Sequence, residues 1–160
     1  MNNKPAITIA PNAKNPLTVN RLGYGTMRLT GEGIYGEPAD RPGALELLKI
    51  AISSGVNFLD TADYYGEDVT NRLIAEALYP YNNDLVICTK VGAARLPDKS
   101  WTLFDTPENL RTSIENNLRT LKQDQIQLVH FRVMPHTKTP FEKSMQAMYD
   151  MQDEGKILHV

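Results

Sequence analysis

Three ionisable side chains stand directly after short, mainly apolar runs of the sequence. Asp60 follows VNFL, Lys90 follows LVICT and His130 follows IQLV. Each run has the length and composition of a buried β-strand. Neighbouring strands of a parallel barrel end on one rim, so we expect the three groups to converge there. A carboxylate, an ammonium and an imidazole at one place can hold and move protons.

A tyrosine, Tyr65, is expected to join these three side chains. Tyr65 lies in the loop that leaves the second predicted strand, five residues after Asp60. An ammonium beside a tyrosine hydroxyl stabilises the phenolate and lowers its pKa from the usual value near 10. Asp60 would keep Lys90 charged and oriented, and His130 would donate a hydrogen bond to a substrate oxygen. Together these groups could deliver a proton to a carbonyl oxygen as negative charge develops on it.

Strands and helices alternate along the chain that carries these residues. Strands are predicted at residues 22–27, 56–59, 85–89, 126–129 and 157–160. The first helix begins at Pro42 and stops at Gly55, the second ends before Pro80, and the third is capped by Thr106 and Pro107. A capping box of Thr139 and Glu142 is expected to open the fourth helix. Three methionines of that helix (Met145, Met148 and Met151) are interpreted as core packing.

This alternation predicts an α/β fold with right-handed crossovers and a parallel sheet. The first strand is not followed by the Gly-x-Gly-x-x-Gly signature of an open dinucleotide-binding sheet, which favours a (β/α)8 barrel. The loops that leave the strands are long (29–41, 91–105 and 134–139), whereas the returns from the helices are short. The rim at the strand ends is therefore the predicted binding face.

Composition excludes several other classes of protein. The 17 Lys and Arg residues against 19 Asp and Glu residues leave a net charge of −2, which argues against nucleic acid or an anionic membrane as a partner. A lone Cys88 excludes an internal disulfide and a cysteine-based zinc site. No apolar run has the length of a membrane span or of a signal peptide core. We therefore expect a cytoplasmic protein without a metal.

These motifs resemble the aldo-keto reductase superfamily over about residues 20–160. The carriers of the resemblance are GYGTM (23–27), NFLDTADYYG (57–66), VICTK (86–90), LVH (128–130) and GKILHV (155–160). The resemblance implies reduction of a small aldehyde or ketone with NADP(H), which supplies the hydride. Tyr65 would be the proton donor, Lys90 and Asp60 its tuning pair, and His130 the group that orients the carbonyl.

The resemblance extends to the cofactor and substrate sites. Gly25, Thr26 and Met27, together with Asp60, match positions near the nicotinamide. By location alone, Tyr35, Trp101 and Phe131 are expected to line the substrate pocket. Only the five-residue spacing selects Tyr65 over its neighbours, so Asp63 and Tyr64 are interpreted as a loop acid and an exposed aromatic residue. NADPH and NADH are not distinguished, because the contacts to the 2′-phosphate lie outside this sequence.

The length of the chain sets a further expectation. A complete barrel takes roughly 250 residues, so this chain would supply the first half: four βα units and the start of strand 5 at residues 20–160. An arm or flap is expected at residues 1–19. We expect little activity from the 160 residues alone, with self-association or a missing second half completing the structure. The alternative is a truncated, non-catalytic half-barrel or a regulatory nucleotide-binding module. Simpler interpretations also remain, with Asp60 and Lys90 as a structural ion pair and His130 as a core histidine.

Overall fold

The computed structural model describes residues 6–160, and its centre is a parallel sheet. The strands run in the order β3 (Tyr24–Gly25), β4 (Phe58–Asp60), β5 (Val86–Arg95), β7 (Ile126–Phe131) and β8 (Ile157–His159). Every pair of neighbours in this order is parallel. Sequential parallel strands joined by helices are the build of a partial α/β barrel, which confirms the predicted fold class.

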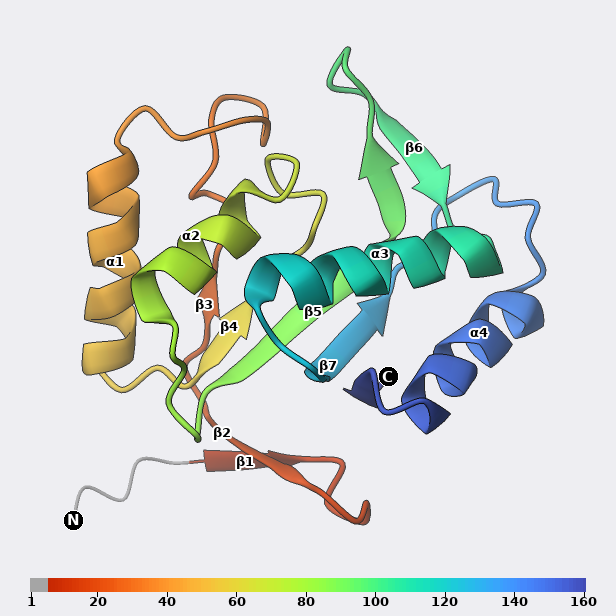
Figure 1. Ribbon diagram of the computed structural model, residues 1–160, viewed down its shortest axis with the longest axis horizontal. Coiled ribbons are helices and arrows are strands. Elements are labelled where there is room, and N and C mark those ends of the chain that lie inside the picture. Colours follow the sequence, from red (N-terminus) through yellow and green to blue (C-terminus); the bar gives the residue numbers. More distant parts are fainter. Residues whose placement is uncertain (1–5) are drawn as a thin grey trace.

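Four helices form the crossovers between these strands (Figure 1): α1 (Arg41–Ser53), α2 (Val69–Leu78), α3 (Pro107–Leu121) and α4 (Phe141–Asp153). The side chain of Asp40 caps α1 by accepting from the Gly43 N–H. Thr106 caps α3 by accepting from the Asn109 N–H, as predicted. The predicted capping box of α4 is wrong, because the Thr139 hydroxyl donates to Asp105 instead and the helix has no side-chain cap.

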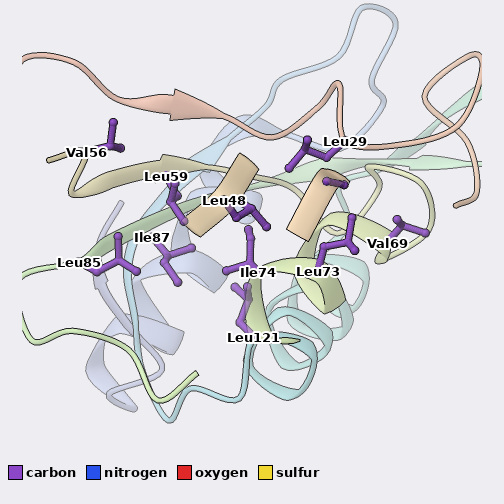
Figure 2. Packing of buried hydrophobic residues seen from close by; sticks show 11 residues of the cluster. Leu29, Leu48, Val56, Leu59, Val69, Leu73, Ile74, Leu85, Ile87 and Leu121 are labelled. Atoms are coloured by element: carbon purple, nitrogen blue, oxygen red, sulfur yellow. The ribbon is translucent and has the colours of Figure 1, made fainter. Parts of the chain in front are cut away.

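Two apolar clusters hold the helices on the sheet. The first lies between α1, α2 and the strands β4 and β5 (Figure 2); its members include Leu48, Leu59, Leu73, Ile74 and Ile87. The second joins α3 and α4 to β5, β7 and β8, and includes Ile114, Val129, Met148, Met151 and Ile157. Met148 and Met151 are fully buried, which confirms that these two methionines pack the core, whereas Met145 is only partly buried.

Two antiparallel hairpins depart from the predicted pattern. β1 (Ala6–Ile9) pairs with β2 (Leu17–Asn20), within the segment predicted as an arm or flap; residues 1–5 lie outside the described residues. β5 does not end before Lys90 but continues to Arg95 and pairs with β6 (Trp101–Phe104). The loop expected at residues 91–105 is therefore largely a hairpin.

The two hairpins mark opposite ends of the sheet (Figure 1). β1 and β2 lie below the beginnings of the strands, whereas β6 stands at the end where the strands finish. The long loops after β3 and β7 reach this second end as well. Among the described residues, none of the helices is both long and apolar enough to cross a membrane.

Candidate active site

An ion pair joins the ends of β4 and β5. Lys90 Nζ donates to Asp60 Oδ2 at 2.7 Å and to the Thr61 carbonyl at 3.0 Å. Both side chains are largely withdrawn from solvent, with exposed fractions of 19% for Lys90 and 33% for Asp60. The two contacts fix the Lys90 ammonium in position between the ends of β4 and β5.

Tyr65 lies beside this ion pair. Lys90 Nζ is 4.8 Å from the centroid of the Tyr65 ring, and the tyrosine is only 6% exposed. Its ring belongs to a small cluster with Ala62, Tyr64 and Ala93, against which Met27, Ile34 and Met134 pack. The structure thus brings Asp60, Tyr65 and Lys90 together, as their spacing predicted.

His130 completes the group from β7. Lys90 and His130 are partners in the parallel register of β5 and β7, so their side chains leave the same face of the sheet. Lys90 was predicted to end its strand, but β5 continues to Arg95. The register of β5 and β7 still places Lys90 next to His130. The imidazole is exposed at this face, and its Nδ1 lies 3.7 Å from Cys88 Sγ.

Asp60, Cys88 and His130 place a carboxylate, a thiol and an imidazole within 4.8 Å of one another. Such a set could bind zinc. However, the Lys90 ammonium already occupies Asp60, and burial raises the pKa of the Cys88 thiol to about 12. The protonated thiol and the bound ammonium both oppose a cation at this place.

A buried polar network behind the ion pair was not predicted. The Thr61 hydroxyl contacts Thr70 and donates to Asn71 Oδ1 at 2.8 Å. Asn71 in turn donates to Asn117 Oδ1 at 2.9 Å, which also accepts from the Thr89 hydroxyl at 2.7 Å. All five side chains are fully buried. In the sequence, the network's helical members Thr70, Asn71 and Asn117 are visible only as polar residues within α2 and α3. The network fixes Thr61, whose carbonyl holds Lys90.

The interpretation of Tyr64 as an exposed aromatic residue is wrong, and Asp63, although it is a loop acid as expected, has a buried carboxyl. The Ser113 hydroxyl of α3 donates to Asp63, and burial raises the pKa of that carboxyl to about 7. Tyr64 is 3% exposed and contacts the rings of Tyr65 and Trp101 edge to face, each at 5.4 Å. The loop after β4 is packed under the β5–β6 hairpin, so both residues are covered.

The residues predicted near a nicotinamide surround Asp60. Gly25 is the register partner of Asp60, and a side chain at Gly25 would meet no atom within 4 Å. Gly25 and Asp60 border a cavity of about 530 Å³. Thr26 is fully buried, and its hydroxyl donates to the Asp60 carbonyl at 3.0 Å. Thr26 therefore supports the backbone of Asp60. The cavity beside Gly25 is walled on its other side by Ile7, Ile9 and Val19 of the β1–β2 hairpin.

The three residues expected to line the substrate pocket separate into two places. Trp101 lines a cavity near Tyr65 and is 37% exposed, and Tyr35 faces Lys99 and Arg95 at its edge. Phe131 instead stacks on Phe141 of α4, with ring centroids 6.1 Å apart, and packs against the second core cluster. Adjacent strand residues point to opposite faces, so Phe131 points away from the face that carries His130.

Comparison with known proteins accounts for this arrangement. The sequence profile described as the Aldo/keto reductase family matches residues 21–160. The chain belongs to this family. Among curated aldo/keto reductase relatives, it is 43% identical over 148 residues to pyridoxine 4-dehydrogenase of Escherichia coli, covering 89% of this chain and 52% of that protein. The chain spans about half the length of the curated relatives it matches.

Solved aldo-keto reductase structures share the fold. The holo form of AKR11C1 from Bacillus halodurans matches with a TM-score of 0.74 and 25% identity, over 89% of this chain and 46% of that one. An aldo-keto reductase from Klebsiella pneumoniae, solved in complex with NADPH, matches with a TM-score of 0.68 and 23% identity, over 88% and 44% of the two chains. The chain therefore has the fold of about half an aldo-keto reductase barrel.

Proposed function

We propose that this chain carries the catalytic residues of an oxidoreductase that reduces a small aldehyde or ketone to an alcohol with NADP(H). The observation that carries the proposal is the contact between Lys90, Asp60 and the ring of Tyr65. Family membership supports the same chemistry, as does the NADPH bound to one of the similar structures. A cytoplasmic location stays a prediction from the sequence.

Each side chain has a distinct role in the proposed reaction. Tyr65 donates the proton to the carbonyl oxygen, because the adjacent Lys90 ammonium stabilises the phenolate that is left behind. Asp60 holds that ammonium by the 2.7 Å contact. His130, in register with Lys90 and exposed at the same face, hydrogen-bonds the carbonyl oxygen and orients it.

The cofactor would approach the same face. Bound NADPH supplies the hydride, which is the chemistry of its nicotinamide ring. The Asp60 side chain and the unfilled space at Gly25 would receive that ring, with Met27 packed nearby against the Tyr65 cluster. Because the chain spans about half of its curated relatives, we expect most contacts to the rest of the dinucleotide to come from outside these residues.

The second candidate is a non-catalytic half-barrel or regulatory module. The observation in its favour is the coverage of about half of the matched relatives. Titration of the 160-residue chain with NADPH, followed by nicotinamide fluorescence, separates the two. We expect weak or undetectable binding by the isolated chain, and tight saturable binding would show that its cofactor site is complete.

Replacement of the proton donor tests the proposed reaction. In the full-length enzyme, we expect Tyr65→Phe to lower kcat for aldehyde reduction by about 10²–10⁴-fold, the range for loss of a general acid. NADPH binding should stay near that of the unaltered enzyme. NADPH consumption measures the first quantity and the titration above the second. Unchanged turnover in Tyr65→Phe would remove this residue from the role.

A further inference from the structure

A cavity with a basic and aromatic wall adjoins the candidate active site. It measures about 660 Å³ and lies between the loop after β3 and the β5–β6 hairpin. Met27 and Ile34 line it and also pack against the Tyr65 cluster. A substrate with its carbonyl at Tyr65 could therefore extend into this cavity.

Two guanidinium groups are held over one indole ring in its wall. Arg95 Cζ lies 4.4 Å and Arg132 Cζ 5.5 Å from the centroid of the Trp101 ring. Stacking on an aromatic ring uses the flat face of a guanidinium and leaves the N–H donors at its edge free for other partners. The edges of two such groups suit the oxygens of a carboxylate or a phosphate.

The backbone brings Arg132 to the same side as His130. The Arg132 N–H donates to the Val91 carbonyl at 2.8 Å, which extends the pairing of β7 with β5 beyond the end of the strand. Strand residues two apart share a face, so Arg132 follows His130 along the catalytic face. Trp101 in turn contacts Tyr64, and Tyr64 contacts Tyr65. The two arginines thus flank the proposed reaction site.

Arg95 and Lys99 of this wall, and Arg132 beside Trp101, have no carboxylate partner in the part of the chain that the structure describes. Arg41, Arg111 and Lys156 form ion pairs elsewhere on the surface. In contrast, none of the ion pairs among residues 6–160 includes Arg95, Lys99 or Arg132.

The donors of Arg95 are only partly used. One terminal nitrogen of Arg95 donates to the Gly33 carbonyl at 2.8 Å, and its buried Nε has no partner. Among the described residues of the wall, Arg28, Arg95 and Lys99 outnumber the single acid Glu32. An unpaired and partly buried guanidinium is costly, and an oxyanion would remove that cost.

We propose that Arg95 and Arg132, held over Trp101, form a subsite for an oxyanion, so that the substrate is a small aldehyde or ketone that also carries a carboxylate or a phosphate. This assignment of a substrate class rests on the proposed carbonyl reduction at Tyr65. The oxyanion binds at the arginines while the carbonyl points to Tyr65 and His130. The subsite itself is formed by this chain, so its binding is measurable without turnover.

Trp101 is the only tryptophan of the chain, and its fluorescence reports directly on the subsite. We would titrate the 160-residue chain with succinic semialdehyde and with its uncharged counterpart butanal, and likewise with glyceraldehyde 3-phosphate and glyceraldehyde. We expect the charged member of at least one pair to bind at least tenfold more tightly. The pair that responds shows whether the anion is a carboxylate or a phosphate, and equal affinity within both pairs would overturn the proposal.

Two substitutions assign the effect to the arginines. Arg132→Gln removes an exposed charge, and Arg95→Gln removes the charge that also holds Gly33. Arg111→Gln is the matched control, because Arg111 pairs with Glu154 far from the cavity. We expect the first two variants to lose the preference for the charged compound and the control to keep it. Should Arg95→Gln fail to fold, Arg132→Gln alone decides, and an unchanged preference in it contradicts the proposal.

Kinetics separate this inference from the proposed function. If the full-length enzyme reduces charged and uncharged members of each pair with equal kcat/KM, the oxyanion subsite is wrong and carbonyl reduction stands. If no carbonyl compound is reduced but the chain still prefers the charged compounds, the reaction is wrong and the subsite stands.

Discussion

The Lys90 ammonium depends on a single carboxylate for its neutralisation. Asp60 reaches it from the neighbouring strand, and the Thr61 carbonyl provides the other acceptor. Because both side chains are largely withdrawn from water, the loss of either partner leaves a charge that solvent compensates poorly. The pair can therefore serve both stability and catalysis. A purely structural pair would affect only the free energy of unfolding when substituted, whereas a catalytic pair would also affect kcat.

Asp60→Asn tests the pair at the level of single residues. We expect it to lower the free energy of unfolding by about 1–3 kcal/mol, since Lys90 loses its charged partner. We also expect kcat of the full-length enzyme to fall by roughly 10²-fold, because the amide holds the ammonium less firmly beside Tyr65. Chemical denaturation and steady-state kinetics measure the two effects.

Asp124→Asn is the control, as it removes an exposed carboxylate and should change neither quantity. A loss of stability in Asp60→Asn without loss of kcat would leave the ion pair a purely structural role.

Asp63 predicts a pH dependence of stability. Burial raises its pKa from 3.8 to about 7 in the folded chain, so between these values the folded state binds the proton and the unfolded state does not. The contribution of Asp63 to stability is therefore greatest below pH 3.8 and is lost as the pH rises to about 7. We expect Asp63→Asn to flatten the pH profile of unfolding between these values. Parallel profiles for the two proteins would show that Asp63 titrates normally.

At the level of elements, one buried polar network joins three of them. Asn71 of α2 and Asn117 of α3 bond to each other, and Asn117 also accepts from Thr89 of β5. Helix–helix and helix–sheet contacts in a barrel are mostly apolar, so this network selects one register of α2 against α3. Its fourth member, Thr61, transmits that register to the carbonyl beside Lys90.

Asn117→Ala tests how strongly the network supports the fold. It leaves the Thr89 hydroxyl without its partner and removes one of the acceptors of Asn71 in a dry environment, so we expect a loss of about 2–4 kcal/mol in the free energy of unfolding. Asn116→Ala is the neighbouring control, since Asn116 bonds to Asp68 and Arg119 near the surface. A similar loss in both variants would contradict a special role of the buried network.

The helices could be predicted from the sequence more fully than the length of β5. They could be predicted because their signals are local in the sequence. Apolar periodicity marks the buried face of each helix, and residues such as Thr106 and Pro107 mark where one begins. The extent of β5 was missed because Lys90 was interpreted as the end of an apolar run. Its charge is accommodated by Asp60, a partner distant in sequence, and residues beyond it pair with β6.

The sequence predicted those residues of the candidate site that lie near the ends of parallel strands. Asp60, Lys90 and His130 lie on one face because alternation and parallel register require it. Phe131 was expected to line the substrate pocket. Because it directly follows His130 in β7, its side chain points to the opposite face of the sheet. The network of Asn71 and Asn117 was not predicted, because polar side chains become buried only when two separately predicted helices meet.

At the level of the whole molecule, the sheet is an arc with two free edges. In the part that the structure describes, β3 pairs only with β4, and β8 pairs only with β7. Such edges present unpaired backbone groups that pair readily with another strand. We expect the 160-residue chain to self-associate in a concentration-dependent manner, as measured by sedimentation velocity. A monomer at all concentrations would contradict this expectation.

The β1–β2 hairpin spans the base of this arc. Asn57, the residue before β4, donates to the Thr18 carbonyl of β2, and His159 of β8 contacts the Asn15 carbonyl at 2.7 Å at the other side. The hairpin therefore connects the start of β4 with β8 and limits how far these two strands can separate. If the contact between His159 and the hairpin is removed, the curvature of the sheet should relax at both of its edge strands. Hydrogen exchange of the Tyr24 and Ile157 amides should then become faster in both places together.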